Sequence, residues 1–201
     1  MELFCNAAKR ISRKIGISVC DSLGMLSPVQ AKRYHAAGVT RYHHNLETAR
    51  SFFPEICSTH AYDDDVESLR NARASGMQVC SGGILGMGES RWQRVEFAFT
   101  LAECAVDSIP INFLTPIAGT RLAHSPTLEP QEALRSIALF RVINPSRDIL
   151  IAGGRSTALG DWQSWIYAAG ANGMMTGDYL TTPGSAAGYD RKLMRTLGIR
   201  D

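Results

Sequence analysis

Cysteine and arginine residues stand at the ends of several short apolar stretches, where they could act as metal ligands. Cys20 ends ISVC and Cys80 ends MQVC, so two thiols are expected at one rim of a sheet. Taken singly, each cysteine is more often a core residue than a ligand. Arg155 follows two glycines in IAGGRST, where a buried guanidinium needs an anion or a cluster as partner. The alternative is an ordinary surface arginine.

Two further segments place polar groups after apolar stretches. YHHNLET, residues 42–48, gathers two histidines, an amide and a carboxylate, and its plainer interpretation is a polar loop that satisfies its own backbone. SGGILGMGE, residues 81–89, combines glycines that permit close backbone approach with Glu89, which can accept hydrogen bonds from loop amides. This second pattern suits an adenine-like or carboxylate ligand, although a glycine-rich turn alone is a weak signal.

These segments alternate with amphipathic stretches whose ends carry helix signals. Ser27 with Pro28 begins one predicted helix, and Ser90 with Gln93 has the capping-box spacing. Strands are predicted at residues 17–20, 40–45, 77–85, 108–114, 149–154 and 172–178. Helices are predicted at residues 4–16, 27–38, 63–76, 90–104, 129–143 and 159–170.

This alternation predicts an α/β fold with a parallel sheet covered by helices. Polar residues cluster at the carboxyl ends of the strands, where (β/α) barrels place their active sites. The sequence contains no GxGxxG or P-loop motif, which argues against an open nucleotide-binding sheet. We therefore expect residues 1–201 to form a single incomplete TIM-type barrel of about six parallel strand–helix units. A full barrel takes about 250 residues. We therefore infer that about two strand–helix units are absent from the N-terminal side.

Composition restricts the partners. The net charge of +2 shows no basic stripe, which argues against nucleic acid, and no apolar run is long enough for a membrane span. We expect a cytoplasmic protein with a small-molecule substrate. Five cysteines at irregular spacing, without a CxxC pair, predict no disulfide framework and no local metal site.

Several segments together resemble biotin synthases, a family of radical S-adenosylmethionine enzymes. The matching segments occur in the family's order through nearly all of the chain: LGMLS, AGVTRYHHNLET, VCSGGILGMGES, IPINFL, GTRLA, AGGR and AGANGMMTGDYLTT. The resemblance implies sulfur insertion into dethiobiotin. In that chemistry a [4Fe-4S] cluster cleaves S-adenosylmethionine to a 5′-deoxyadenosyl radical, and a [2Fe-2S] cluster supplies the sulfur.

The resemblance also assigns site residues. Cys20 and Cys80 match two of the three cysteine ligands of the [2Fe-2S] cluster, and Arg155 matches its arginine ligand. Asn45 and Asn112 match substrate-contacting residues. The cofactor-binding positions implied for S-adenosylmethionine are Asn45, Glu47, Gly82, Gly83, Ile84, Gly86 and Glu89. His43 stands where many members have asparagine. The roles of His43, His44, Cys5, Cys57 and Cys104 stay open.

The CxxxCxxC motif that holds the [4Fe-4S] cluster in this family does not occur in the sequence. We therefore expect a C-terminal portion that is not competent alone. The alternatives are a non-catalytic fragment that binds dethiobiotin or a cluster, a half barrel that depends on a partner chain, and another radical S-adenosylmethionine relative. For the complete enzyme the resemblance implies a homodimer and a flavodoxin-like electron donor.

Overall fold

The computed structural model describes residues 1–179 and 184–199. Its helical segments are α1 (Glu2–Ile15), α2 (Pro28–Ala36), α3 (Phe53–Ile56), α4 (Tyr62–Ala74), α5 (Arg91–Glu103), α6 (Pro130–Ile143), α7 (Arg155–Leu159), the 3₁₀ turn η1 (Gly160–Trp162), α8 (Trp165–Ala168) and α9 (Ala187–Thr196). Its strands are β1 (Val19–Asp21), β2 (Val39–His43), β3 (Gln78–Cys80), β4 (Gly83–Leu85), β5 (Ser108–Phe113), β6 (Asp148–Ile151) and β7 (Gly173–Met174).

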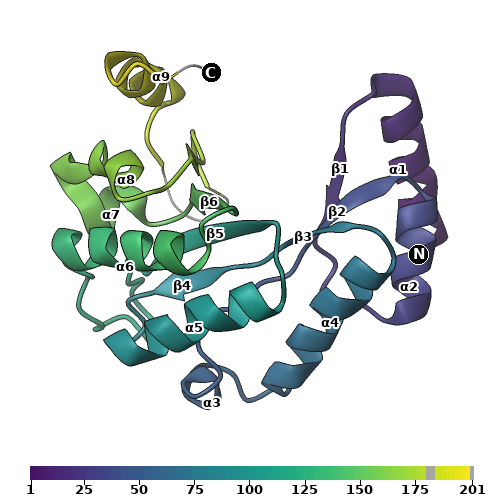
Figure 1. Cartoon of the computed structure of the whole chain (residues 1–201), viewed down its shortest axis with the longest axis horizontal. Helices are drawn as coiled ribbons and strands as arrows, with labels where there is room; N and C mark the ends of the chain where they lie inside the picture. The colour runs from purple at the N-terminus through teal and green to yellow at the C-terminus, as the bar shows by residue number, and fades with distance from the viewer. Residues whose placement is uncertain (180–183, 200–201) are drawn as a thin grey trace.

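The strands form one parallel sheet in the order β1-β2-β3-β5-β6-β7, with β4 also paired to β5. Each of the six predicted strand regions contains a strand. Figure 1 shows the curved sheet with α4, α5 and α6 on its outer side and an open side between α1 and α9. The predicted α/β fold, an incomplete TIM-type barrel, is therefore confirmed.

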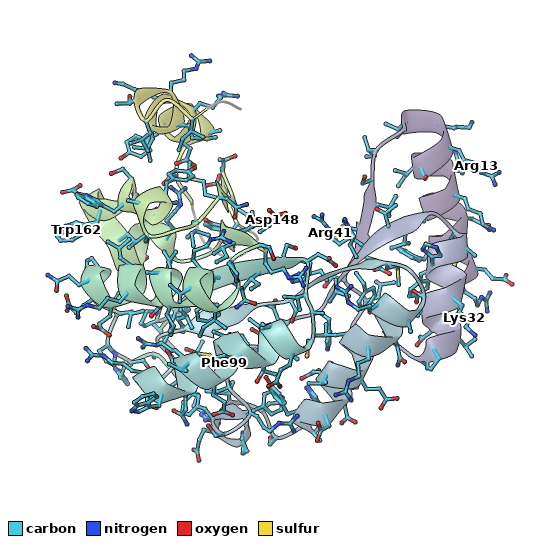
Figure 2. The ribbon with its side chains drawn as sticks, viewed as in Figure 1. Arg13, Lys32, Arg41, Phe99, Asp148 and Trp162 are labelled. Atoms are coloured by element: carbon cyan, nitrogen blue, oxygen red, sulfur yellow. The ribbon has the colours of Figure 1, made fainter. Side chains whose placement is uncertain are left out.

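Apolar residues between the sheet and its outer helices form the core. Ile109, Ile111 and Ile149 of β5 and β6 are fully or almost fully buried, as are Leu101 of α5 and Ile137 of α6. In Figure 2, Arg41 of β2 lies toward the open side, whereas Phe99 lies on α5. The outer layer therefore holds the sheet together and leaves its other side for polar groups.

The third predicted strand is interrupted. Residues 77–85 form β3 and β4, with a break at residues 81–82. The pairing register with β5 is the same on both sides, since Cys80 pairs with Ser108 and Gly83 with Ile111. Pro110 lies in β5 opposite the break, and proline has no N–H to donate to the ladder. We attribute the interruption to this missing donor.

The prediction of one continuous helix at residues 159–170 is wrong. The chain instead forms the end of α7, the turn η1 and the short α8. Gly160 adopts φ 49° and ψ −122°, a conformation that ends the helix and that a side chain would disfavour. By contrast, the capping boxes of Ser27 with Gln30 and of Ser90 with Gln93 are both formed.

The two ends of the sheet are open in the described part of the chain. There β1 pairs only with β2, and β7 pairs only with β6. Within residues 1–179 and 184–199, no helix combines the length and apolar character that a membrane crossing requires.

Candidate functional site

The segment after β2 is fastened to the neighbouring strands by backbone hydrogen bonds. His44 donates to the Cys80 carbonyl over 3.0 Å, Leu46 to the Gly82 carbonyl over 3.1 Å, and Ile84 to the Glu47 carbonyl over 2.9 Å. Because these bonds continue the pairing beyond the strand end, residues 43–47 are held rigidly beside β3 and β4.

Gly83 is required by this close approach of backbones, and Gly82 by the approach of β5 on the other side. A Cβ at Gly83 would lie 2.1 Å from the Glu47 carbonyl oxygen, and one at Gly82 would lie 1.9 Å from the Pro110 carbonyl oxygen. Glu47 itself adopts φ 63°, an uncommon left-handed conformation for a non-glycine residue. Gly83 thus allows residues 43–47 to lie where they do, and Gly82 allows β5 to approach.

A cavity of about 250 Å³ opens beside this segment. Its lining comes from the loop after β1, the end of β2 and the segment after it, α3, the connection from α3 to α4, and α4: Ser22, Gly24, His43, His44, Asn45, Glu47, Phe53, Ile56, Cys57, His60 and Asp65. Asn45 accepts a hydrogen bond from the Gly82 N–H over 3.1 Å and lies 3.5 Å from Glu47 Oε2. Burial raises the pKa of the Glu47 carboxyl, and the Asn45 hydrogen bond partly opposes this rise.

The two candidate cysteine ligands lie on either side of β2. Cys80 ends β3 as predicted, while Cys20 lies one residue before the end of β1. Their β2 neighbours are Arg41, in register with Cys20, and His43, in register with Cys80. His43 Nδ1 lies 3.3 Å from the Cys80 sulfur.

Burial raises the pKa of both thiols. The Arg41 guanidinium opposes the rise at each, and Cys20 adds to it at Cys80. Cys20 is exposed, whereas Cys80 is buried. Among the residues that the structure describes, no group of three or more His, Cys, Asp or Glu side chains is arranged to hold a metal ion.

Arg155 is buried and paired with an anion, one of the two partners that sequence reasoning required. Its Nη2 lies 3.0 and 2.9 Å from the two carboxylate oxygens of Asp190, and its Nη1 donates to Gln163 over 2.8 Å. The buried Nε has no hydrogen-bond partner within the described residues. Asp190 of α9 was missed from the sequence, because nothing local connects it with Arg155.

The loop after β4 is stabilised from within. As predicted, Glu89 accepts hydrogen bonds from loop amides, with Gly86 N and Met87 N each at 2.8 Å. The same carboxylate accepts from Arg94 Nε over 2.8 Å. Ser90 and Gln93 then cap α5, so that the loop leads directly into the helix. The polar atoms of Glu89 are therefore occupied by the protein itself.

Asn112 lies on β5, in register with Ile84, and its amide group connects β4 with the segment after β6. It donates to the Gly83 carbonyl over 3.2 Å and accepts from the Gly153 N–H over 2.9 Å. Asn112 does not line the cavity that Asn45 and Glu47 share, so these two candidate sites are separate in this structure.

A buried carboxylate between two histidines was missed by sequence reasoning. Asp65 of α4 lies 2.7 Å from His44 Nε2 and 3.0 Å from His60 Nε2, and its side chain is only 4% exposed. The aspartates at residues 63–65 indicated only a helix start. Helical spacing could have predicted that Asp65 is buried, because it lies on the same helix face as the buried Leu69 and Ala72.

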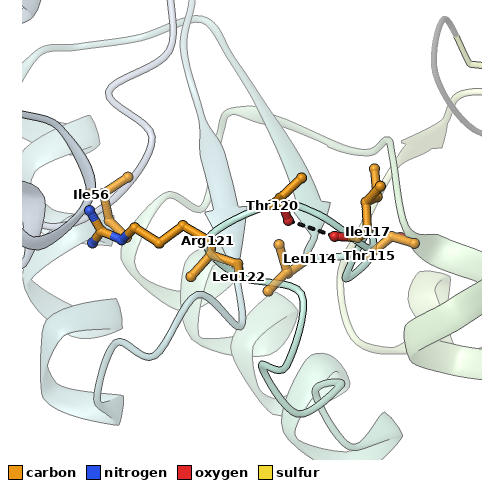
Figure 3. Close-up of a pocket in the computed structure, with 7 residues that line it drawn as sticks. All are labelled: Ile56, Leu114, Thr115, Ile117, Thr120, Arg121 and Leu122. Atoms are coloured by element: carbon orange, nitrogen blue, oxygen red, sulfur yellow. Dashed lines mark hydrogen bonds between the residues drawn. The ribbon is translucent and has the colours of Figure 1, made fainter.

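A second cavity, of about 330 Å³, lies beyond the end of β5 (Figure 3). Its walls are mostly apolar, and among the described residues that line it Arg121 alone is charged: Ile56, Leu114, Thr115, Ile117, Thr120, Arg121 and Leu122. Ile56 lines both cavities, so the two are neighbours. Such a cavity suits an apolar ligand with one anionic end.

Two family models divide the chain. Residues 1–101 match the radical SAM superfamily, and residues 110–200 match the biotin and thiamin synthesis associated domain. The chain belongs to the radical SAM superfamily. A biotin synthase of Nitratidesulfovibrio vulgaris strain DP4 is 57% identical over 200 residues, which is 100% of this chain and 55% of that protein. Another, from Syntrophus aciditrophicus, is 55% identical over 98% of this chain and 60% of its own length.

The resemblance to biotin synthases is thereby confirmed for the whole chain, which spans little more than half the length of these curated relatives. Membership of a radical SAM family also implies iron–sulfur and S-adenosylmethionine chemistry. Of the matched C-terminal segment AGANGMMTGDYLTT, residues 180–182 lie outside the described part of the chain.

Solved structures show the same fold. Methylornithine synthase, PylB, superimposes with a TM-score of 0.80 at 18% identity, over 99% of this chain and 63% of that one. HydG, a maturase of the [FeFe]-hydrogenase, superimposes with a TM-score of 0.77 at 14% identity, over 98% of this chain and 49% of that one. Identities this low support the fold alone.

Proposed function

We propose that this chain is part of a biotin synthase, an enzyme that inserts sulfur into dethiobiotin by radical S-adenosylmethionine chemistry. The observation that carries the proposal is the 57% identity to a biotin synthase along the entire chain. Residues 1–201 would act as one folded unit, since the sheet runs without a gap across the boundary between the two family matches through the pairing of β4 with β5. We further propose a cytoplasmic location, a homodimer in the complete enzyme, and a flavodoxin-like electron donor.

Cys20, Cys80 and Arg155 are the residues proposed to hold a [2Fe-2S] cluster. The donor set is chemically suitable, because thiolates are the usual ligands of iron–sulfur clusters. The two cysteines flank β2, and the Arg155 Nε has no partner in the part of the chain that the structure describes. When bound, the cluster supplies the sulfur atom. Burial works against deprotonation of both thiols, and the Arg41 guanidinium partly offsets this at each.

The cavity beside β2 is the proposed place for S-adenosylmethionine. Asn45 and Glu47 present polar groups to it and are held by backbone bonds to β3 and β4. The strand edge of Gly82, Gly83 and Ile84, with the loop of Gly86 and Glu89, would support the adenine. Two roles follow for these groups: Asn45 and Glu47 bind polar parts of the cofactor, whereas Glu89 keeps the loop in shape.

Dethiobiotin is proposed to contact Asn45 and Asn112, of which only Asn45 lines the cavity beside β2 and neither lines the second cavity. Its aliphatic chain ends in a carboxylate, which matches the second cavity, where apolar walls meet the Arg121 guanidinium. Binding there would exclude water from the reacting carbons and fix them relative to the cofactor. The CxxxCxxC motif does not occur in the 201 residues. We therefore expect the chain by itself to form no 5′-deoxyadenosine.

Anaerobic loading with iron and sulfide tests the cysteine assignment without depending on turnover. The wild-type chain is expected to gain the visible absorption of a [2Fe-2S] cluster and, after reduction, its electron paramagnetic resonance signal. Cys80→Ala should lose both signals. Cys104→Ala, at a half-buried cysteine next to α5, is the matched control and should keep them. Equal cluster content in all three proteins would refute the assignment.

A further inference from the structure

We propose that Cys57, His60 and Asp65 form a nucleophilic thiol site that reacts with a sulfur atom of small disulfides, with His60 as the base and Asp65 as its orienting partner. The proposal goes beyond the sulfur-insertion function and does not depend on it. It rests on the contacts of one side-chain cluster at the cavity that also contains Asn45 and Glu47.

The first step is the orientation of His60. Its Nε2 lies 3.0 Å from Asp65 Oδ2. Because a carboxylate oxygen accepts hydrogen bonds, Nε2 carries the hydrogen and the lone pair is on Nδ1. His44 Nε2 lies 2.7 Å from the other carboxylate oxygen and so fixes the carboxylate in place. Edge-to-face packing against Phe53, with ring centroids 5.5 Å apart, also holds the His60 ring.

The second step is the position of the thiol. The Cys57 sulfur lies 3.4 Å from His60 Nδ1, the accepting nitrogen, and 3.3 Å from Thr59 Oγ1. The Thr59 hydroxyl is itself 2.9 Å from the same His60 nitrogen. The thiol proton therefore has an acceptor within contact, either directly or through the hydroxyl. This order of thiol, imidazole and carboxylate is the arrangement that activates a nucleophile.

The third step is the contrast with the other thiols of the chain. The Thr59 hydrogen bond lowers the pKa of the Cys57 thiol, and His60 adds to the effect. Burial instead raises the pKa of Cys20, Cys80 and Cys104. Cys57 is partly exposed and lines a cavity, so a small molecule can reach it. A thiol with these properties forms the thiolate, which is the attacking species.

The reaction is thiol–disulfide exchange. The Cys57 thiol passes its proton to His60, and the thiolate attacks one sulfur of the disulfide. The disulfide bond breaks, a mixed disulfide forms on Cys57, and the released thiolate takes the proton back from His60. The Cys57 sulfur is oxidised, and the leaving sulfur is reduced by the same amount.

Dithiodipyridine, a small disulfide, is the probe. The folded 201-residue chain would be treated at pH 7 with less than one equivalent, and the modified cysteine identified by peptide mass spectrometry. Modification of Cys57 is expected to be at least about tenfold faster than that of Cys104, because the thiolate fraction governs the rate. In urea the five cysteines should react alike. A folded chain in which Cys20 or Cys104 reacts as fast as Cys57 would overturn the proposal.

His60→Gln separates activation from simple exposure. This variant should slow modification of Cys57 by about tenfold and leave the rate at Cys104 unchanged. His124→Gln changes an exposed histidine far along the chain from the cluster and is the matched control, with no change expected at either cysteine. An unaltered Cys57 rate in His60→Gln would contradict the role of the base. The wild-type order of reactivity stands as a test even if this variant does not fold.

Discussion

Glu89 and Asp65 are two almost fully buried carboxylates at the same end of the sheet, and they differ in what surrounds them. Their side chains are 1% and 4% exposed. Glu89 meets two backbone amides and the Arg94 guanidinium, all of which belong to its own loop and helix. Asp65 meets two imidazoles that line a cavity. The comparison teaches that burial alone does not indicate function, since the partners decide it.

The largest loss of unfolding free energy is expected when Glu89 is substituted. Glu89→Gln leaves the buried Arg94 without its nearest anion, since Glu132 lies farther away at 3.7 Å. Breaking a buried ion pair in this way costs about 3–5 kcal/mol of unfolding free energy. Urea unfolding followed by circular dichroism would measure it. A loss below about 1 kcal/mol would show that the loop does not depend on this pair.

Gly83→Ala tests whether the segment after β2 is positioned by backbone contact. The new Cβ would lie 2.1 Å from the Glu47 carbonyl oxygen, so residues 43–47 must shift. A loss of about 1–3 kcal/mol is expected, as for other overpacked sites. Gly188→Ala in α9, where a Cβ meets nothing within 4 Å, is the control and should be neutral or stabilising. Equal effects of the two substitutions would contradict the positioning.

Asp65→Asn sharpens the comparison with Glu89. This change removes a hydrogen-bond acceptor from two imidazoles, whereas Glu89→Gln unpairs a buried guanidinium that is always charged. A smaller loss is expected, about 1–2 kcal/mol, which is the cost of unmade hydrogen bonds. The same urea titration measures it. A loss equal to that of Glu89→Gln would remove the distinction between the two carboxylates.

Asp21 supplies a third buried carboxylate, one whose Oδ2 has no partner in the described part of the chain. Burial raises its pKa from 3.8 to about 6. Since the folded-state pKa lies above the unfolded value, the protonated form stabilises the fold. That stability is complete below pH 3.8 and is lost as the pH rises through about 6.

Asp21→Asn should therefore raise the unfolding free energy at pH 7. The gain is expected to be about 1 kcal/mol, because the amide still has to be buried. Unfolding measured at pH 4 and pH 7 would test it, with a difference between variant and wild type only at the higher pH. A destabilised variant at pH 7 would contradict the assignment.

The sequence predicted those features that depend on neighbouring residues. Strand–helix alternation, the caps at Ser27 and Ser90, and the acceptance of loop amides by Glu89 are all found. Features that depend on distant contacts were not predictable. Asp190 is 35 residues from Arg155, and Asp65 is 21 residues from His44. Neither pairing leaves a local pattern, because each exists only after the elements pack.

The strand and helix interruptions show the same limit. Residues 77–85 form an apolar stretch typical of one strand. The break at residues 81–82 is opposite Pro110, which lies on a different strand, β5. The glycines at residues 82 and 83 indicated a close approach of a ligand. In the structure what approaches them is the protein's own backbone, at Pro110 and Glu47. Glycines alone do not reveal which of the two is present.

Binding of S-adenosylmethionine tests most directly whether the cavity beside β2 is the ligand site. Isothermal titration of the chain with S-adenosylmethionine would be compared between wild type, Asn45→Ala, and Asn6→Ala, an exposed asparagine on α1 that serves as control. We predict that the wild type and Asn6→Ala bind equally, and that Asn45→Ala binds about tenfold more weakly, a difference of about 1.4 kcal/mol. Equal affinity in all three proteins, or no binding to the wild type, would contradict the account.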